Sequence, residues 1–158
     1  MSNSFLIDKA FSRKYEEYFG VRLSKKRGST ILLNDGKHDD FGVDLYEVQT
    51  GAKIDVKCYR RPRLISSFTG VFIETLLPLS GRPGWYTDES KKTTGYIFVI
   101  DADEWDINYK KAYIISREML GCAIRAAEKD GALVEKETRS GCGFILPYDY
   151  LRYWGCEL

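Results

Sequence analysis

The chain of 158 residues lacks the features that mark several common classes of protein. It has one histidine and four scattered cysteines, none in a Cys-x-x-Cys pair, which argues against a structural zinc site and favours buried, reduced thiols. No apolar run approaches the roughly 20 residues that span a bilayer, and no secretory leader pattern opens the chain. We therefore expect a soluble, cytoplasmic protein with no membrane partner.

An excess of charge of one sign is also missing. Lysine and arginine number 24 against 23 acidic residues, so the net charge is +1 and any binding of nucleic acid has to come from local basic patches. The sequence contains no Gly-rich phosphate loop of the P-loop or dinucleotide-binding type. It also shows no repeat and no linker, so its length predicts a single domain over residues 1–158.

The pattern of apolar residues predicts a helix at each end of a group of strands. Phe11, Tyr15 and Phe19 recur at helical spacing in a helix over 4–19 that Gly20 would end, and Ser116 would begin a second helix. Strands are expected at 31–33, 42–48, 53–60, 71–76, 96–100 and 111–115, with turns at 130–143 and a last short strand or irregular piece at 143–154. This order predicts an α/β (α+β) fold with a mixed central β-sheet flanked by helices.

Two acids and a lysine lie on the hairpin formed by residues 42–60. Asp44 enters the first strand, and Asp55 and Lys57 share one face of the second because side chains alternate along a strand. Neighbouring carboxylates resist ionising without a cation, and hard oxygen ligands suit Mg²⁺. A lysine beside them can orient an attacking water or stabilise charge on a phosphate. The hairpin is therefore a candidate site for phosphodiester hydrolysis.

The first helix offers a third acid. At 100° per residue Asp8 lies on the same helix face as Phe11 and Tyr15, at the edge of the buried side. A charged residue is unusual there unless it has a functional role. We prefer Asp8 as the helix-borne metal ligand, with Glu16, about 80° away around the helix, as the alternative. Glu74, on the strand over 71–76, is either a further metal ligand or a buried partner of an arginine.

A helix with an acid, then Asp44, then Asp55-x-Lys57 on a hairpin, resembles the PD-(D/E)XK nuclease superfamily, whose members have the restriction-endonuclease-like fold. The segment 25–29, Lys-Lys-Arg-Gly-Ser, is similar to the loop before the first acid of Holliday junction resolvases. The segments 69–74, 84–85 and 92–99 resemble small phage nucleases, so the likeness covers about residues 5–100. The chain departs from the pattern of this superfamily at two positions. Val43, not proline, precedes Asp44, and Gly95 stands where an acid is expected before the buried strand.

The resemblance implies an endodeoxyribonuclease that uses Mg²⁺ or Mn²⁺ on DNA, with branched or phage DNA as candidate substrates in a bacterial or phage-infected cell. Asp44, Asp55 and the carbonyl of Val56 would bind the metal, and Lys57 would position the water. Cleavage of two strands would call for a homodimer. The alternative is a catalytically silent module of the same fold that binds nucleic acid or a protein partner. RNA processing by the same metal chemistry is a third hypothesis.

Several other residues have two open interpretations. The basic residues that either contact phosphates or lie in solvent are Arg60, Arg61, Arg63, Lys25, Lys26, Arg27, Lys91 and Lys92. Trp85 and Tyr86 either stack on a base or pack at the edge of the core. His38 is either a general base or a solvated loop residue, and Asp39 and Asp40 are alternatives to Asp44.

Overall fold

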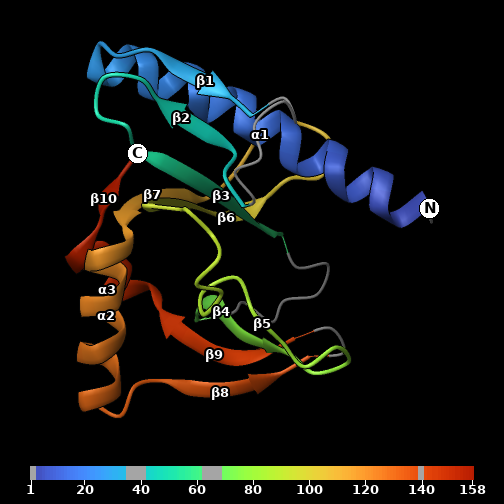
Figure 1. Ribbon diagram of the computed structural model, residues 1–158, viewed down its shortest axis with the longest axis vertical. Helices are drawn as coiled ribbons and strands as arrows, with labels where there is room; N and C mark the ends of the chain where they lie inside the picture. Colours follow the sequence, from blue (N-terminus) through green and yellow to red (C-terminus); the bar gives the residue numbers. More distant parts are fainter. Residues whose placement is uncertain (1–2, 35–41, 62–68, 139–140) are drawn as a thin grey trace.

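The computed structural model describes residues 3–34, 42–61, 69–138 and 141–158, the first five of them by their backbone only (Figure 1). Helices and strands alternate irregularly along the chain. In order they are α1 (Asn3–Arg27), β1 (Ile31–Leu33), β2 (Leu45–Glu47), β3 (Lys53–Arg60), β4 (Gly70–Leu77), β5 (Arg82–Pro83), β6 (Gly95–Ala102), β7 (Lys111–Ser116), α2 (Arg117–Lys129), β8 (Val134–Glu137), β9 (Cys142–Pro147), α3 (Tyr148–Trp154) and β10 (Cys156–Glu157). No helix in these ranges is long and apolar enough to cross a membrane.

The larger sheet is mixed, as the sequence predicts. Its strand order is β1-β2-β3-β6-β7-β10, and every pair is antiparallel except β3 with β6. A parallel pair needs a long crossover connection, and here the crossover carries β4 and β5. These two strands join β9 and β8 in a second, antiparallel sheet with the order β5-β4-β9-β8. The mixed α+β class is therefore confirmed, and the second sheet is an addition.

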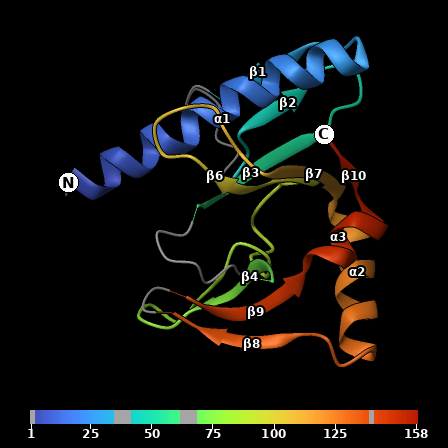
Figure 2. The ribbon, with the colours of Figure 1, turned by 180° about the vertical axis from the view of Figure 1, so that it is seen from behind.

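The molecule has three layers. Figures 1 and 2 show α1 across one face of the six-stranded sheet, the four-stranded sheet on the opposite side, and α2 with α3 at one end. Strand β6 is buried on both faces, as predicted: Ile97 packs with Tyr15 and Phe19 of α1, whereas Phe98 packs with Val71 of β4. The prediction that helices flank the central sheet is thus confirmed for one face of the six-stranded sheet, while the four-stranded sheet covers much of the other face.

Helix α1 is longer than predicted, and Gly20 does not end it. Gly20 is buried inside the helix, where a Cβ would lie 3.5 Å from Leu45 Cδ2, so the helix packs closely on the hairpin. Leu23, fully buried, continues the apolar stripe. The helix ends before Gly28, whose φ of +61° favours glycine. The basic segment expected as a loop is therefore mostly the last turn of a helix, where cations suit the helix dipole.

The C-terminal third is more regular than predicted. Ser116 caps α2 as expected, since its side chain accepts a hydrogen bond from Met119 N. The stretch predicted as turns contains β8, and the last stretch forms β9 and α3. The sequence of strand β8, Val-Glu-Lys-Glu, has one apolar residue and therefore no alternation of apolar and polar residues. All four residues are exposed. Its pairing with β9 alone defines it as a strand.

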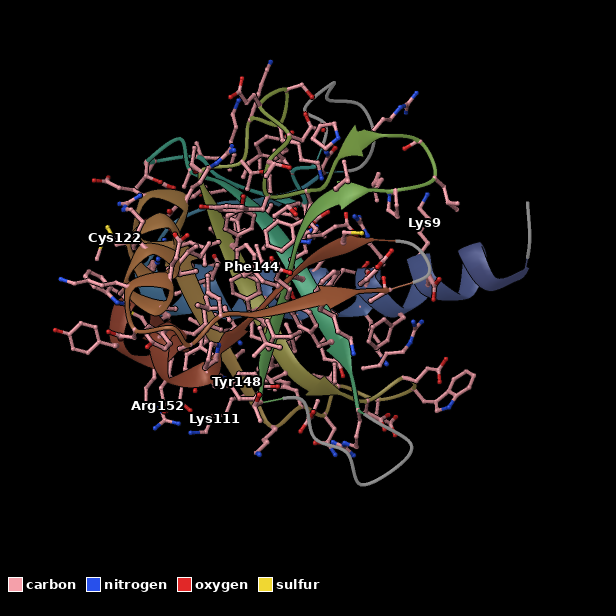
Figure 3. The ribbon with its side chains drawn as sticks, turned by 90° about the horizontal axis from the view of Figure 1, so that it is seen from below. Lys9, Lys111, Cys122, Phe144, Tyr148 and Arg152 are labelled. Atoms are coloured by element: carbon pink, nitrogen blue, oxygen red, sulfur yellow. The ribbon has the colours of Figure 1, made fainter. Side chains whose placement is uncertain are left out.

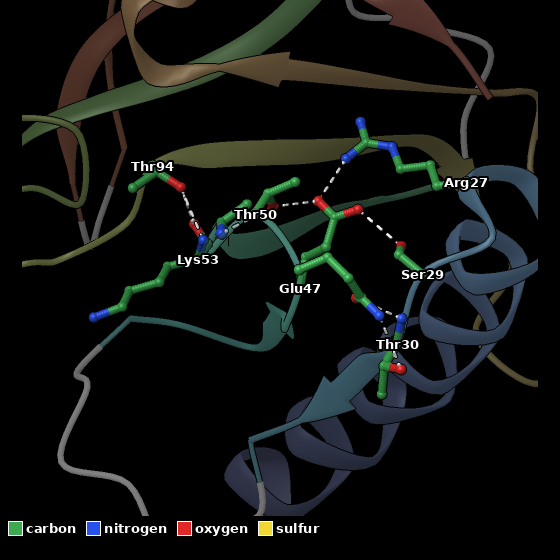
Figure 4. A network of polar contacts seen from close by, with 9 residues as sticks. Arg27, Ser29, Thr30, Glu47, Thr50, Lys53 and Thr94 are labelled. Atoms are coloured by element: carbon green, nitrogen blue, oxygen red, sulfur yellow. Dashed lines mark hydrogen bonds and ion pairs between the residues drawn. The ribbon is translucent and has the colours of Figure 1, made fainter.

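A buried glutamate ties the end of α1 to the hairpin (Figure 4). Glu47 is 3% exposed, and its carboxylate accepts hydrogen bonds from Arg27 Nη1 at 3.0 Å, Ser29 Oγ at 2.8 Å and Thr50 Oγ1 at 2.7 Å. Burial by itself raises the pKa of Glu47, but the hydrogen bonds from Thr50 and Ser29 and the charge of Arg27 outweigh it, and the pKa lies below its ordinary value. This network ties the end of α1 to β2 and to the turn that leads into β3.

Candidate functional site

Asp44 turns its side chain back onto the next strand. It stands immediately before β2, and its backbone N–H donates to Ile54 O at 2.9 Å. Its Oδ2 accepts a hydrogen bond from Val56 N at 2.7 Å. The Asp44 carboxylate is therefore held beside the peptide that follows Asp55.

Asp55 and Lys57 lie on one face of β3, as alternation predicts, while Ile54 and Val56 pack toward α1 on the other. Asp55 is only 4% exposed, and Lys57 Nζ lies 2.9 Å from its Oδ2. The same ammonium stands 5.0 Å from the centroid of the Trp85 ring, a cation–π contact that holds it in place. No hydrogen bond from the described residues reaches Asp55 Oδ2 with good geometry. A buried carboxylate is costly unless a cation compensates it, and here the Lys57 ammonium at 2.9 Å does so.

Glu16 brings a third acid from α1. Its side chain is 13% exposed and lies 3.4 Å from Arg13 Nη1. Burial raises the pKa of Glu16, Arg13 opposes this, and the charge of Asp55 adds to the rise. Burial, followed by the charges of Asp55 and Glu16, raises the pKa of Asp44 to about 8. Acids from α1, the start of β2 and β3 are therefore close enough to oppose one another's ionisation.

Asp8, the preferred third acid from the sequence, does not join this group. Its side chain is 58% exposed and pairs with Arg60, whose guanidinium lies 4.4 Å from the Phe11 ring centroid. A position on the buried face of α1 does not bring Asp8 to the site, because eight residues at 1.5 Å each separate it from Glu16 by about 12 Å along the helix axis. The alternative, Glu16, is the helix-borne acid whose charge acts on Asp44 and Asp55.

Lys91 lies near Asp55 and Lys57, and Glu74 of β4, a candidate metal ligand from the sequence, acts on Lys91 and is not placed beside Asp55. Burial lowers the pKa of Lys91, the charge of Lys57 lowers it further, and Asp55 and Glu74 act in the opposite direction. The stem of Lys91 runs beside Gly42, where a Cβ would lie 2.8 Å from Lys91 Cδ. Lys91 is thus a second lysine at the site. From the sequence it was only one of several candidate phosphate contacts, because nothing in its neighbourhood places it near the hairpin.

The remaining basic candidates are not gathered at the acids. Arg60 and Arg61 are exposed at the far end of β3, and Arg61 Nη1 lies 4.0 Å from Asp103. Lys25 and Lys26 lie in the last turn of α1, with Lys25 about 14 Å along the helix from Glu16. Arg63, like His38, Asp39 and Asp40, falls outside the described residues.

Trp85 packs at the edge of the core, one of the two predicted roles. Its ring centroid lies 5.1 Å from that of Tyr96 and 6.1 Å from that of Phe98, and its face carries Lys57. Trp85 therefore supports the lysine rather than presenting a free face to a base. Tyr86 lies beside it, with 6.1 Å between the ring centroids.

The donor set fits a hard divalent cation. Asp44 and Asp55 offer carboxylate oxygens at the hairpin, and Glu16 is near enough for its charge to act on Asp44. The Val56 carbonyl points to the same side of β3 as the Val56 N–H that meets Asp44, because both groups of one strand residue point the same way. Within the described ranges no three acidic, histidine or cysteine side chains form a ready metal-binding group. The fit therefore rests on ligand chemistry and on the closeness of Asp44 to Asp55, which helps to raise the pKa of Asp44, not on a finished coordination geometry.

Comparison with protein-family models finds none that matches this chain, and a search of curated proteins finds no relative.

Proposed function

We propose that this protein is a metal-dependent nuclease that hydrolyses phosphodiester bonds of DNA. The observation that carries the proposal is the bond from Val56 N to Asp44 Oδ2, which brings a second carboxylate to the strand bearing Asp55 and Lys57. The proposal extends to a restriction-endonuclease-like core, to Mg²⁺ or Mn²⁺ as cofactor, to action in the cytoplasm and to a homodimer where two strands are cut.

Each side chain of the site has a role that its surroundings support. Asp44, Asp55, Glu16 and the Val56 carbonyl would hold the metal, which supplies charge compensation at the phosphate and activates water. Lys57, held between Asp55 and the Trp85 ring, orients the attacking water or stabilises charge on the scissile phosphate. This division of roles makes both Asp55 and Lys57 necessary.

The test compares Asp55→Ala and Lys57→Ala with matched exposed residues. Asp149, 83% exposed in its side chain, and Lys110, also exposed, supply the controls Asp149→Ala and Lys110→Ala. With plasmid and single-stranded DNA in Mg²⁺ or Mn²⁺, the two site variants should lose cleavage while folded, and the controls should retain it. Full activity in either purified site variant contradicts the proposal.

A second function has support from the charge of the chain. A net charge of +1 is low for a nuclease that holds DNA by its phosphates, and Lys57 already pairs with Asp55. A catalytically silent module that binds nucleic acid or a protein partner would keep this pair without metal. Such a module would show no increase in melting temperature with Mn²⁺, whereas the nuclease would show one.

A further inference from the structure

A second site lies farther along the same strand face. Between the ends of β3 and β6 and the four-stranded sheet the structure has a pocket of about 210 Å³. Its lining includes the rings of Tyr59, Phe72 and Tyr148, each half-buried, and the side chain of Ile145. Figure 3 views this side of the molecule, with Tyr148 labelled at the end of β9. The volume is below the roughly 300 Å³ at which pockets for drug-sized ligands begin, so it suits one ring system.

The pocket and Lys57 lie on the same face of β3. Tyr59 follows Lys57 by two residues and Asp55 by four, so it shares their face at about 7 and 13 Å along β3. Phe72 precedes Glu74 by two residues on β4 and shares its face in the same way. Tyr59 Oη donates to Phe72 O at 2.9 Å, which fixes the two sheets to each other at the pocket.

The polar members of the lining suit a nucleobase. Asp101 adopts φ of +51°, in the left-handed region that side chains other than glycine seldom occupy. Its carboxylate is an acceptor for the amino group of a base. Three aromatic rings around a space for one ring system supply stacking surfaces, which tolerate any base. Arg60 and Lys136 also line the pocket, and Arg60 is paired with Asp8.

We propose that this pocket takes one unstacked base of the strand whose phosphate lies at Asp55 and Lys57, so that the substrate is nucleic acid with an unpaired nucleotide about two to four positions from the cut. The inference rests on the proposed nuclease function. At about 3.4 Å per stacked nucleotide, the distance from Lys57 or Asp55 to Tyr59 corresponds to about two to four steps of a strand. A base in perfect duplex DNA cannot enter without leaving its stack, and an unpaired base can.

The test separates base binding from cleavage. Binding of a labelled single-stranded oligonucleotide is measured by fluorescence anisotropy in EDTA, beside a strand of equal length made of abasic residues, which keeps the phosphates and lacks the bases. Phe72→Leu removes a ring from the pocket, Phe72→Tyr keeps one, and Trp105→Leu removes a 79% exposed ring that does not line it. Circular dichroism melting checks that each variant folds.

We expect Phe72→Leu to weaken binding of the normal strand at least about fivefold and to leave the abasic strand unaffected. Phe72→Tyr and Trp105→Leu should match the wild type. If Phe72→Leu weakens binding of both strands equally, or of neither, the inference is overturned. It is also overturned if the wild type binds the normal and the abasic strand equally well. If base-dependent binding is present but no metal-dependent cleavage occurs, the nuclease function fails and the pocket stands. If cleavage occurs and Phe72→Leu changes nothing, the pocket fails and the nuclease stands.

Discussion

Replacing Glu16 by Gln tests which acid of the first helix belongs to the site. The side chain of Glu16 is 13% exposed and its charge acts on Asp44, whereas the side chain of Asp8 is 58% exposed and pairs with Arg60. If Glu16 is a metal ligand, Glu16→Gln should lower metal affinity by about 100-fold, at the upper end of the losses seen when supporting groups of a metal site are removed.

The magnitude follows from linkage between binding and folding. Mn²⁺ at 100 times its Kd stabilises the wild type by about 2.7 kcal/mol, and a 100-fold loss of affinity leaves about 0.4 kcal/mol. For a domain of this size 1 kcal/mol corresponds to about 2–4 °C in Tm. The Mn²⁺-dependent rise in Tm should therefore fall from about 5–11 °C to about 1–2 °C in Glu16→Gln.

The assay is differential scanning fluorimetry of matched variants with Mn²⁺ and with EDTA. Asp8→Asn is the control, because it removes a carboxylate from the same helix at an exposed ion pair worth under about 1 kcal/mol. It should keep the full rise in Tm. A full rise in Glu16→Gln together with a lost one in Asp8→Asn would refute the assignment and restore Asp8 as the helix-borne acid.

Three further predictions concern single substitutions. Asp44→Asn should raise Tm in EDTA at pH 7, because the folded pKa of Asp44 is about 8 and the folded chain must protonate a carboxyl that the unfolded chain leaves ionised; asparagine removes this cost. The substitution should also abolish the rise with Mn²⁺, and a lower Tm in EDTA would contradict the raised pKa. Glu47→Gln should lower the free energy of unfolding by about 1–3 kcal/mol at pH 7. Because the folded pKa of Glu47 lies below its unfolded value, its stabilisation is present above pH about 4.5 and lost as pH falls through the folded pKa, so urea titrations should show the difference shrinking in acid. Gly42→Ala should destabilise the fold by about 1–3 kcal/mol and impair cleavage, because φ is +77° and the new Cβ would displace the stem of Lys91; an unchanged urea midpoint would exclude this strain.

Local periodicity was enough to predict most of the six-stranded sheet. The hairpin, the doubly buried strand β6 and the start of α2 at Ser116 all follow from spacing that neighbouring residues carry themselves. The second sheet was missed as a unit because its strands come from both sides of β6 and β7 in the sequence. Strand β8 has no apolar alternation, and Gly20 continues α1 because its close contact with Leu45 overrides the local preference to end a helix.

The sequence by itself determined the pairing of Asp55 with Lys57, since alternation on one strand places both on the same face and requires no distant contact. Only the tertiary structure decided which other groups meet them. The charge of Glu16, and not that of Asp8, acts on Asp55 because the position of α1 on the sheet sets which turn of the helix lies near β3, and the stem of Lys91 packs beside Gly42. These contacts depend on how elements far apart in the chain pack, and a pattern read along one element does not contain that information.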